Sequence, residues 1–147
     1  MILQREIDTG FDLLDLHCHN PERYPFFLES GSAGPQGQFD ILFACPADCL
    51  TLTSLEQADF LSELDTAWSQ ESTPEAVSST DLPFQGGWFL FLSYELAGQI
   101  EPQLTLHTDT GGLPLASATR VPAAVIHNHA NGRRYLVAET AALMTTL

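Results

Sequence analysis

The sequence predicts an α+β fold in which a largely antiparallel sheet packs with two or three helices. Several segments have the length and composition of strands, whereas only one long segment repeats apolar residues at helical spacing. Asn131-Gly132 separates two of the strand-like segments and is a strong signal for a β-hairpin. With 147 residues, 44% of them hydrophobic, residues 1–147 are expected to form a single domain with a real core.

The first elements are expected to be short. Asp8 or Thr9 is placed to cap a helix over residues 11–17. Residues 24–29 have the composition of a strand. The glycine-rich residues 30–37 are predicted to form a loop.

The next elements are expected to be a hairpin and a helix. Residues 39–45 and 50–52 are predicted to be strands that pair with each other. Ser54 and Gln57 form a capping box, which predicts a helix starting there and continuing over residues 55–68.

The rest of the chain alternates loops with extended segments. Residues 70–81 are rich in Ser, Thr and Glu and are predicted to be a mobile surface loop. Residues 88–92 are predicted to form a strand, residues 94–99 a helical turn and residues 104–113 a loop. Residues 116–128 are expected to be extended and to pair as a hairpin with residues 133–139.

The charge balance excludes several classes of function. Nineteen acidic residues stand against five arginines and no lysine, for a net charge of −14. This balance repels phosphate, so neither nucleic acid nor an anionic membrane is an expected partner. The absence of lysine excludes a Schiff base or a P-loop lysine within these residues.

The location is expected to be cytoplasmic. No apolar run approaches the ~20 residues of a membrane span, and the acidic N-terminal segment is unlike a secretory signal. Three cysteines do not form a disulfide framework in a chain of this size, which favours a reducing compartment.

Two groups of residues contain metal-binding side chains. The first comprises His17, Cys18, His19, Cys45 and Cys49, whose spacing does not match a zinc motif. The second is the His-Asn-His run over residues 127–129, where alternation places both histidines on one face, interpreted as a polar solvent face. No metal ligand and no catalytic residue is predicted in this chain.

One segment has the composition of a binding pocket. Phe26, Phe27 and Leu28 are followed by Glu29 and Ser30. An apolar slot that ends in a carboxylate and a hydroxyl suits an amino acid, whose ammonium group would pair with the carboxylate. The alternative is that Phe26 and Leu28 belong to the core and that Glu29-Ser30 is the exit of a strand.

Four segments in order resemble one enzyme family. They are RYPFFLES, QFDILFA, LPFQGG and SYEL, over residues 23–30, 38–44, 82–87 and 93–96. They resemble the N-terminal region of the chorismate-utilising enzymes, namely component I of aminodeoxychorismate synthase (para-aminobenzoate synthase) and of anthranilate synthase. The stretch DLPFQGGWFLFLSYEL is most similar to the aminodeoxychorismate branch.

The resemblance implies a non-catalytic part of a transferase. In that family the chorismate site, the Mg²⁺-binding glutamates and a catalytic lysine belong to a C-terminal domain, which is expected to be absent from this chain. The whole enzyme aminates chorismate to 4-amino-4-deoxychorismate for para-aminobenzoate and folate synthesis. A glutamine amidotransferase subunit supplies ammonia as the partner in a heterodimer. These residues alone are expected to be inactive, with no cofactor of their own, and to expose apolar surface that leads to self-association or poor solubility.

The resemblance also assigns a role to the pocket segment. Leu28, Glu29 and Ser30 match the end of a motif that forms part of a tryptophan pocket, which makes L-tryptophan a candidate ligand. Phe27 departs from the family, which has leucine there, and Leu90 stands where the family often has glycine. The alternatives are the tryptophan-binding regulatory domain of anthranilate synthase component I and a stand-alone amino-acid-binding module.

Overall fold

The computed structural model describes residues 2–8, 10–31, 34, 37–57, 59–71, 81–106 and 111–147. The chain folds into two compact units, each described below by itself. Unit 1 comprises Met1–Ala47, Pro74–Gly87 and Arg120–Leu147, and unit 2 comprises Asp48–Thr73 and Trp88–Thr119. Two antiparallel sheets and a few short helices confirm the predicted α+β class.

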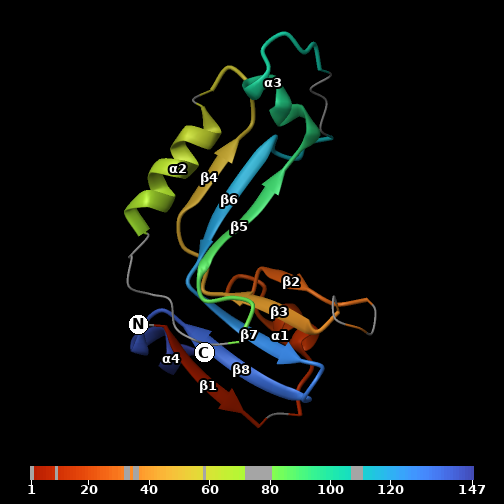
Figure 1. The fold of residues 1–147 in the computed structure, drawn as a ribbon, viewed down its shortest axis with the longest axis vertical. Coiled ribbons are helices and arrows are strands. Elements are labelled where there is room, and N and C mark those ends of the chain that lie inside the picture. Colours follow the sequence, from red (N-terminus) through yellow and green to blue (C-terminus); the bar gives the residue numbers. More distant parts are fainter. Residues whose placement is uncertain are drawn as a thin grey trace. The chain divides into compact units, whose positions relative to one another are not determined.

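Unit 1 is built on a five-stranded sheet in the order β1-β8-β7-β3-β2, in which each neighbouring pair is antiparallel (Figure 1). β7 and β8 form the hairpin that the sequence predicted, and Gly132 in its turn has φ +68°, which glycine adopts without strain. The strands are β1 (Leu3–Ile7), β2 (Phe26–Leu28), β3 (Phe39–Ala44), β7 (Ala123–Asn128) and β8 (Arg133–Ala138).

One face of this sheet packs against two helices, α1 (Leu13–His19) and α4 (Ala141–Thr146). The side chain of Asp12 accepts a hydrogen bond from the Leu14 amide at 2.8 Å, so Asp12 caps α1. The expected start at residue 11 with Asp8 as the cap is therefore wrong, and Thr9 lies outside the described residues. The core between sheet and helices contains Leu13, Tyr24, Leu42, Ala44, Ala123, Val125, Leu136, Ala138 and Met144.

The other face of the sheet is covered by the segment that carries Leu82 and Phe84. Both side chains pack on Ala124, Ile126 and Val137, and the ring of Phe84 meets that of Phe43 edge-on, with centroids 5.0 Å apart. β3 and β7 are therefore covered on both faces.

Gly86 and Gly87 lie against a partly buried ion pair of unit 1. Arg120, only 9% exposed, donates to the carbonyl of Gly87 at 2.9 Å and pairs with Glu139 at 2.5 Å. A Cβ on Gly86, whose φ is +98°, would overlap the Glu139 carboxylate. The glycine pair thus serves a close backbone approach.

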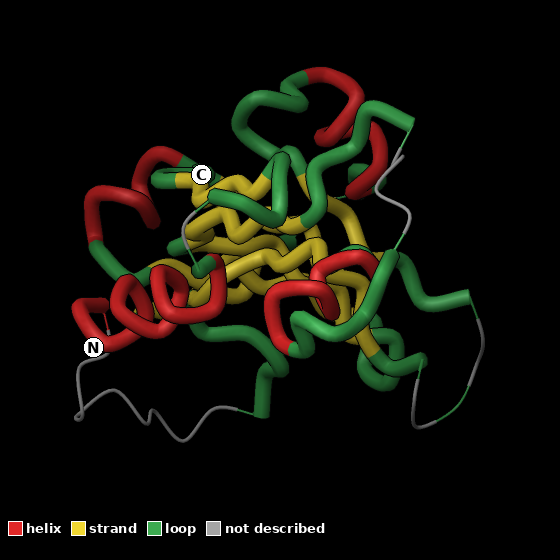
Figure 2. Tube along the Cα trace, turned by 90° about the horizontal axis from the view of Figure 1, so that it is seen from above, coloured by secondary structure: helices red, strands yellow, loops and turns green. Residues whose placement is uncertain are grey.

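Unit 2 is built on a three-stranded sheet in the order β4-β6-β5 (Figure 1). Figure 2 marks the helices in red and the strands in yellow. β6 belongs to this unit as far as Thr119. The buried core centres on Phe60, Leu96 and Leu115. The elements are β4 (Cys49–Leu52), α2 (Phe60–Glu71), β5 (Gly87–Leu92), the 3₁₀ turn η1 (Tyr94–Leu96), α3 (Ala97–Ile100) and β6 (Ala116–Val121).

The predicted hairpin between residues 39–45 and 50–52 is wrong. β3 pairs with β2 and β7, whereas β4 pairs with β6, and the two strands belong to different units. Between them Cys45 has φ +58°, its amide donates to the Arg23 carbonyl, and the Ala47 amide donates to the Arg120 carbonyl. These bonds hold the connecting segment away from a hairpin turn.

The predicted start of the long helix is also wrong. α2 begins at Phe60 because the Asp59 carboxylate accepts the amides of Leu61 and Ser62 at 3.1 and 3.3 Å. The Gln57 side chain does reach back to the Ser54 amide, at 3.1 Å, but this contact closes a separate turn.

The structure also adds elements to the prediction. β1 was not predicted, and the extended segment 116–128 is divided into β6 and β7 at Pro122. Much of the predicted loops at 30–37, 70–81 and 104–113 lies outside the described residues. Among the described residues, no helix is long and apolar enough to cross a membrane.

Candidate functional site

Strand register brings three ionisable residues of unit 1 into one row. Asp40 on β3 lies opposite His127 on β7, which lies opposite Arg134 on β8. Alternation along β3 places Asp40 on the same face as Leu42, which packs in the core under α1. The three side chains therefore form a polar row at one end of that core.

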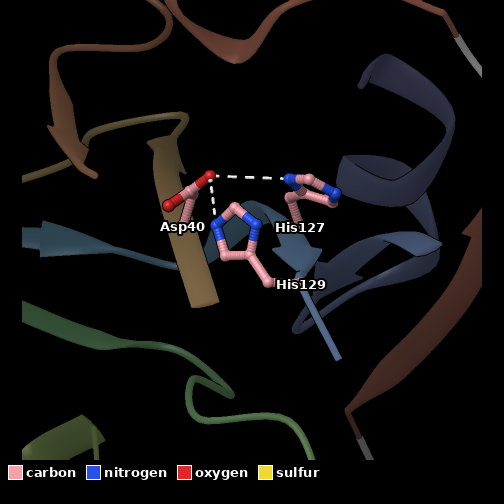
Figure 3. A group of neighbouring side chains, drawn as sticks. All are labelled: Asp40, His127 and His129. Carbon is pink, nitrogen blue, oxygen red and sulfur yellow. Dashed lines mark ion pairs between the residues drawn. The ribbon is translucent and has the colours of Figure 1, made fainter. Parts of the chain in front are cut away.

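Both histidines of the His-Asn-His run converge on Asp40 (Figure 3). The Asp40 Oδ2 atom lies 2.8 Å from Nε2 of His129 and 3.5 Å from Nδ1 of His127. The two imidazole rings are tilted by 58°, with centroids 4.5 Å apart. His129 reaches this position beyond the end of β7, where its amide donates to the Gln38 carbonyl at 2.8 Å.

The Asp40 carboxylate is held in a fixed orientation. Its Oδ1 atom accepts the Ser30 amide at 2.9 Å, and the Ser30 hydroxyl donates to the Phe39 carbonyl at 2.6 Å. Burial by itself would raise the pKa of Asp40, but the Ser30 amide and the two histidines together lower it below its usual value. The ionised form is thus favoured although the residue is only 7% exposed.

A pocket of about 350 Å³ adjoins the cluster. Its wall combines acidic groups, a guanidinium group, imidazoles and aromatic rings, so it has both polar and apolar parts. The lining residues are Gly10, Phe11, Asp12, Leu13, Phe27, Glu29, Asp40, His127, His129 and Arg134.

The three predicted pocket residues have different surroundings. Glu29 lines the pocket, whereas Ser30 holds the Asp40 carboxylate through its backbone amide. Leu28, the last residue of β2, is 50% exposed and does not line the pocket. A shared role for them in binding tryptophan stays a prediction.

The expectation of a polar solvent face at residues 127–129 is wrong for His127, which is half-buried, whereas His129 is exposed and still pairs with Asp40. The side chain of His127 is only 21% exposed and that of His129 41%. A signal was available in the sequence: Asp40 is the single charged residue of an otherwise apolar strand, and a buried carboxylate needs partners.

The other metal-binding side chains have different neighbours. The Nδ1 atom of His17 lies 2.6 Å from the Tyr24 carbonyl oxygen, and that of His19 lies 2.7 Å from the Asp15 carbonyl oxygen. Cys45 and Cys49 belong to different units. Within the described part of the chain, Asp40, His127 and His129 are the group whose ligand atoms gather closely enough to hold a metal ion.

This arrangement has the donor atoms of a metal site and the wall of a small-molecule pocket. Two imidazoles and a carboxylate bind transition metals, while Glu29 and Arg134 offer opposite charges to a polar ligand. No family model matches this chain, and no curated protein matches it at a significant level.

Proposed function

We propose that this chain is the non-catalytic N-terminal part of an aminodeoxychorismate synthase component I, acting in the cytoplasm. In this proposal it packs on a chorismate-binding catalytic domain, which acts with a glutamine amidotransferase subunit. The catalytic domain carries the Mg²⁺ site and aminates chorismate. The chain shapes that assembly and performs no chemistry by itself.

The observation that carries this proposal is the apolar surface of unit 2. Among the described residues, nine large apolar side chains of this unit are at least 38% exposed, against two in unit 1. Exposed apolar side chains that gather in one patch are typical of an interaction surface, and three of these, Leu61, Trp68 and Leu90, line one groove. The nine are Leu61, Trp68, Leu90, Phe91, Leu92, Tyr94, Ile100, Leu104 and Leu113.

A groove lies within this surface, between α2 and β5 of unit 2. It has a volume of about 320 Å³ and its wall is mostly apolar. Leu90, which replaces the glycine often found in the family, lines it together with Trp68 and Trp88. Such a groove suits an apolar element of a partner domain.

Reconstitution tests the proposal. The chain and a separately produced chorismate-binding domain of an aminodeoxychorismate synthase component I are mixed, and chorismate amination with ammonia is followed by chromatography. We expect the chain alone to leave chorismate unchanged, and the mixture to associate and to aminate faster than the catalytic domain alone. Leu90→Asp should weaken the association at least tenfold, because it places a charge in the apolar groove.

Leu14→Asp is the matched control, because Leu14 is 47% exposed in unit 1 and Leu90 is 45% exposed in unit 2. This variant should associate like the unchanged chain. Turnover of chorismate by the chain alone would contradict the proposal. So would failure to associate with the catalytic domain.

The pocket of unit 1 favours a second candidate, an amino-acid-binding module. Glu29 can pair with an ammonium group, Arg134 with a carboxylate, and Phe11 and Phe27 offer aromatic rings to a side chain. The same pocket would serve the tryptophan-binding domain of anthranilate synthase component I.

Calorimetry with L-tryptophan in chelator-containing buffer separates the two candidates. Saturable binding that Glu29→Gln weakens at least tenfold would favour the amino-acid-binding module. The absence of heat at millimolar tryptophan would favour the scaffold function. Asp12→Asn, a substitution of another carboxylate of the pocket wall, is the control for a general charge effect.

A further inference from the structure

We propose that Asp40, His127 and His129 form a binding site for a divalent transition metal of the zinc class. The site goes beyond the scaffold function, which requires no metal in this chain. Its donors are two imidazole nitrogens and one carboxylate oxygen. This donor set suits zinc, cobalt, nickel or ferrous ions, whereas magnesium and calcium prefer oxygen ligands throughout.

The distances between the donor atoms fit one ion. One donor atom from each of His127, His129 and Asp40 lies within 4.8 Å of the donor atoms of the other two residues. A tetrahedral ion with bonds of about 2.0–2.1 Å holds its ligands about 3.4 Å apart. The two distances from Oδ2, 2.8 and 3.5 Å, bracket that value, so a small rotation of the His129 ring admits the ion.

The backbone presents these donors before any ion binds. Asp40 and His127 are paired residues on adjacent strands in the middle of the sheet. The Ser30 amide occupies Oδ1 of Asp40 and leaves Oδ2 facing the imidazoles. Hydrogen bonds of this kind orient metal ligands and raise the affinity of a site.

The site has room for a further ligand. All three residues line the pocket of about 350 Å³, and Glu29 lines it too. Three protein ligands with an open fourth position are typical of zinc sites that bind a water molecule or a substrate. Arg134 in the same wall disfavours a cation, whereas Glu29 and Asp12 offset its charge.

Titration of the chelator-treated full chain with Co²⁺ and with Zn²⁺ tests the site. We expect one equivalent of each ion to bind. Bound Co²⁺ should show the visible absorption of an ion in a site of low symmetry. His127→Asn and His129→Asn should each lower the affinity for Zn²⁺ at least tenfold, because each removes one ligand. His19→Asn is the matched control: His19 is an exposed histidine on α1 and should have no effect.

A second measurement needs no variant and therefore does not depend on whether the variants fold. Zn²⁺ should protect His127 and His129 of the intact chain from diethylpyrocarbonate, while His19 stays reactive, as read by mass spectrometry of peptides. Protection of His19 alone would overturn the proposal. The proposal would also be overturned if no ion bound at millimolar metal, or if both variants kept the affinity of the unchanged chain. A thiolate-to-cobalt charge-transfer band would overturn it too, because such a band reveals cysteine ligands. None of these results depends on chorismate or on a partner domain.

Discussion

Buried charges in unit 1 depend on backbone groups as well as on their ion-pair partners. The Asp40 carboxylate accepts the Ser30 amide, and the Arg120 guanidinium donates to the Gly87 carbonyl as well as to Glu139. A buried charge that loses such a partner keeps its desolvation cost without the compensating attraction. Substitutions of residues around these groups, including glycines, are therefore expected to lower the stability of the fold.

Gly86→Ala tests this at the Arg120–Glu139 pair. The new Cβ would overlap the Glu139 carboxylate, and alanine rarely adopts φ +98°. We expect the free energy of unfolding to fall by about 2–4 kcal/mol, because alanine is strained at this φ and the partly buried pair must open. Urea denaturation followed by circular dichroism measures this value.

Gly10→Ala is the control for the loss of a glycine. A Cβ at Gly10 has no atom within 4 Å and its φ is not positive. We expect a change within about 0.5 kcal/mol. A Gly86→Ala effect as small as that of Gly10→Ala would show that Glu139 moves aside at no cost.

At the scale of the element, α2 shows how a sequence pattern can identify a helix and misplace its start. Two side-chain acceptors that lie two positions apart, Gln57 and Asp59, compete to cap the helix. The Gln57 side chain bonds the amides of Thr53 and Ser54, while Asp59 bonds those of Leu61 and Ser62. Only the second set belongs to the first turn of α2, so Asp59 determines where the helix begins.

Paired substitutions at Asp59 and Ser54 test this assignment. Asp59→Ala should lower the denaturation midpoint of the chain at pH 7, whereas Ser54→Ala should leave it nearly unchanged, because only Asp59 caps α2. Denaturation curves of both variants beside the unchanged chain are the measurement. An equal effect of the two substitutions would support a helix that starts at the earlier turn.

The Asp59 effect should also depend on pH. The hydroxyl of Ser62, together with the amides of Ser62 and Leu61, lowers the pKa of Asp59 below its usual value. A lowered pKa in the folded state gives a stabilisation that is present above the usual pKa of about 3.9. It is lost as the pH falls through the folded value. The difference between the unchanged chain and Asp59→Ala should therefore shrink in acid.

At the scale of the whole molecule, strong net charge and exposed apolar surface act against each other. The net charge of −14 makes copies of the chain repel one another, while unit 2 exposes apolar side chains that favour association. Added salt screens the repulsion and leaves the apolar attraction in place. We therefore expect self-association to increase with ionic strength.

Sedimentation velocity at low and high sodium chloride checks this expectation. The average mass should rise with salt for the unchanged chain and rise less for Leu90→Asp, which lowers the apolar surface of unit 2. Leu14→Asp should behave like the unchanged chain. A monomer at high salt and high concentration would contradict the expectation of self-association.

The sequence by itself determined the α+β class and the hairpin at Asn131-Gly132. Each depends on residues close together in the chain, where turn chemistry and apolar periodicity act directly. The split of the predicted hairpin into β3 and β4 was decided by partners far along the chain, in β7 and β6.

The gathering of Asp40 with His127 and His129 was likewise decided by tertiary structure alone. Asp40 is more than eighty positions away from the two histidines, and the register of β3 on β7 places Asp40 opposite His127. A shift of that register by one residue would turn the Asp40 side chain to the other face of the sheet. No local pattern encodes such a register, because it depends on which apolar faces pack together when the whole sheet of unit 1 forms.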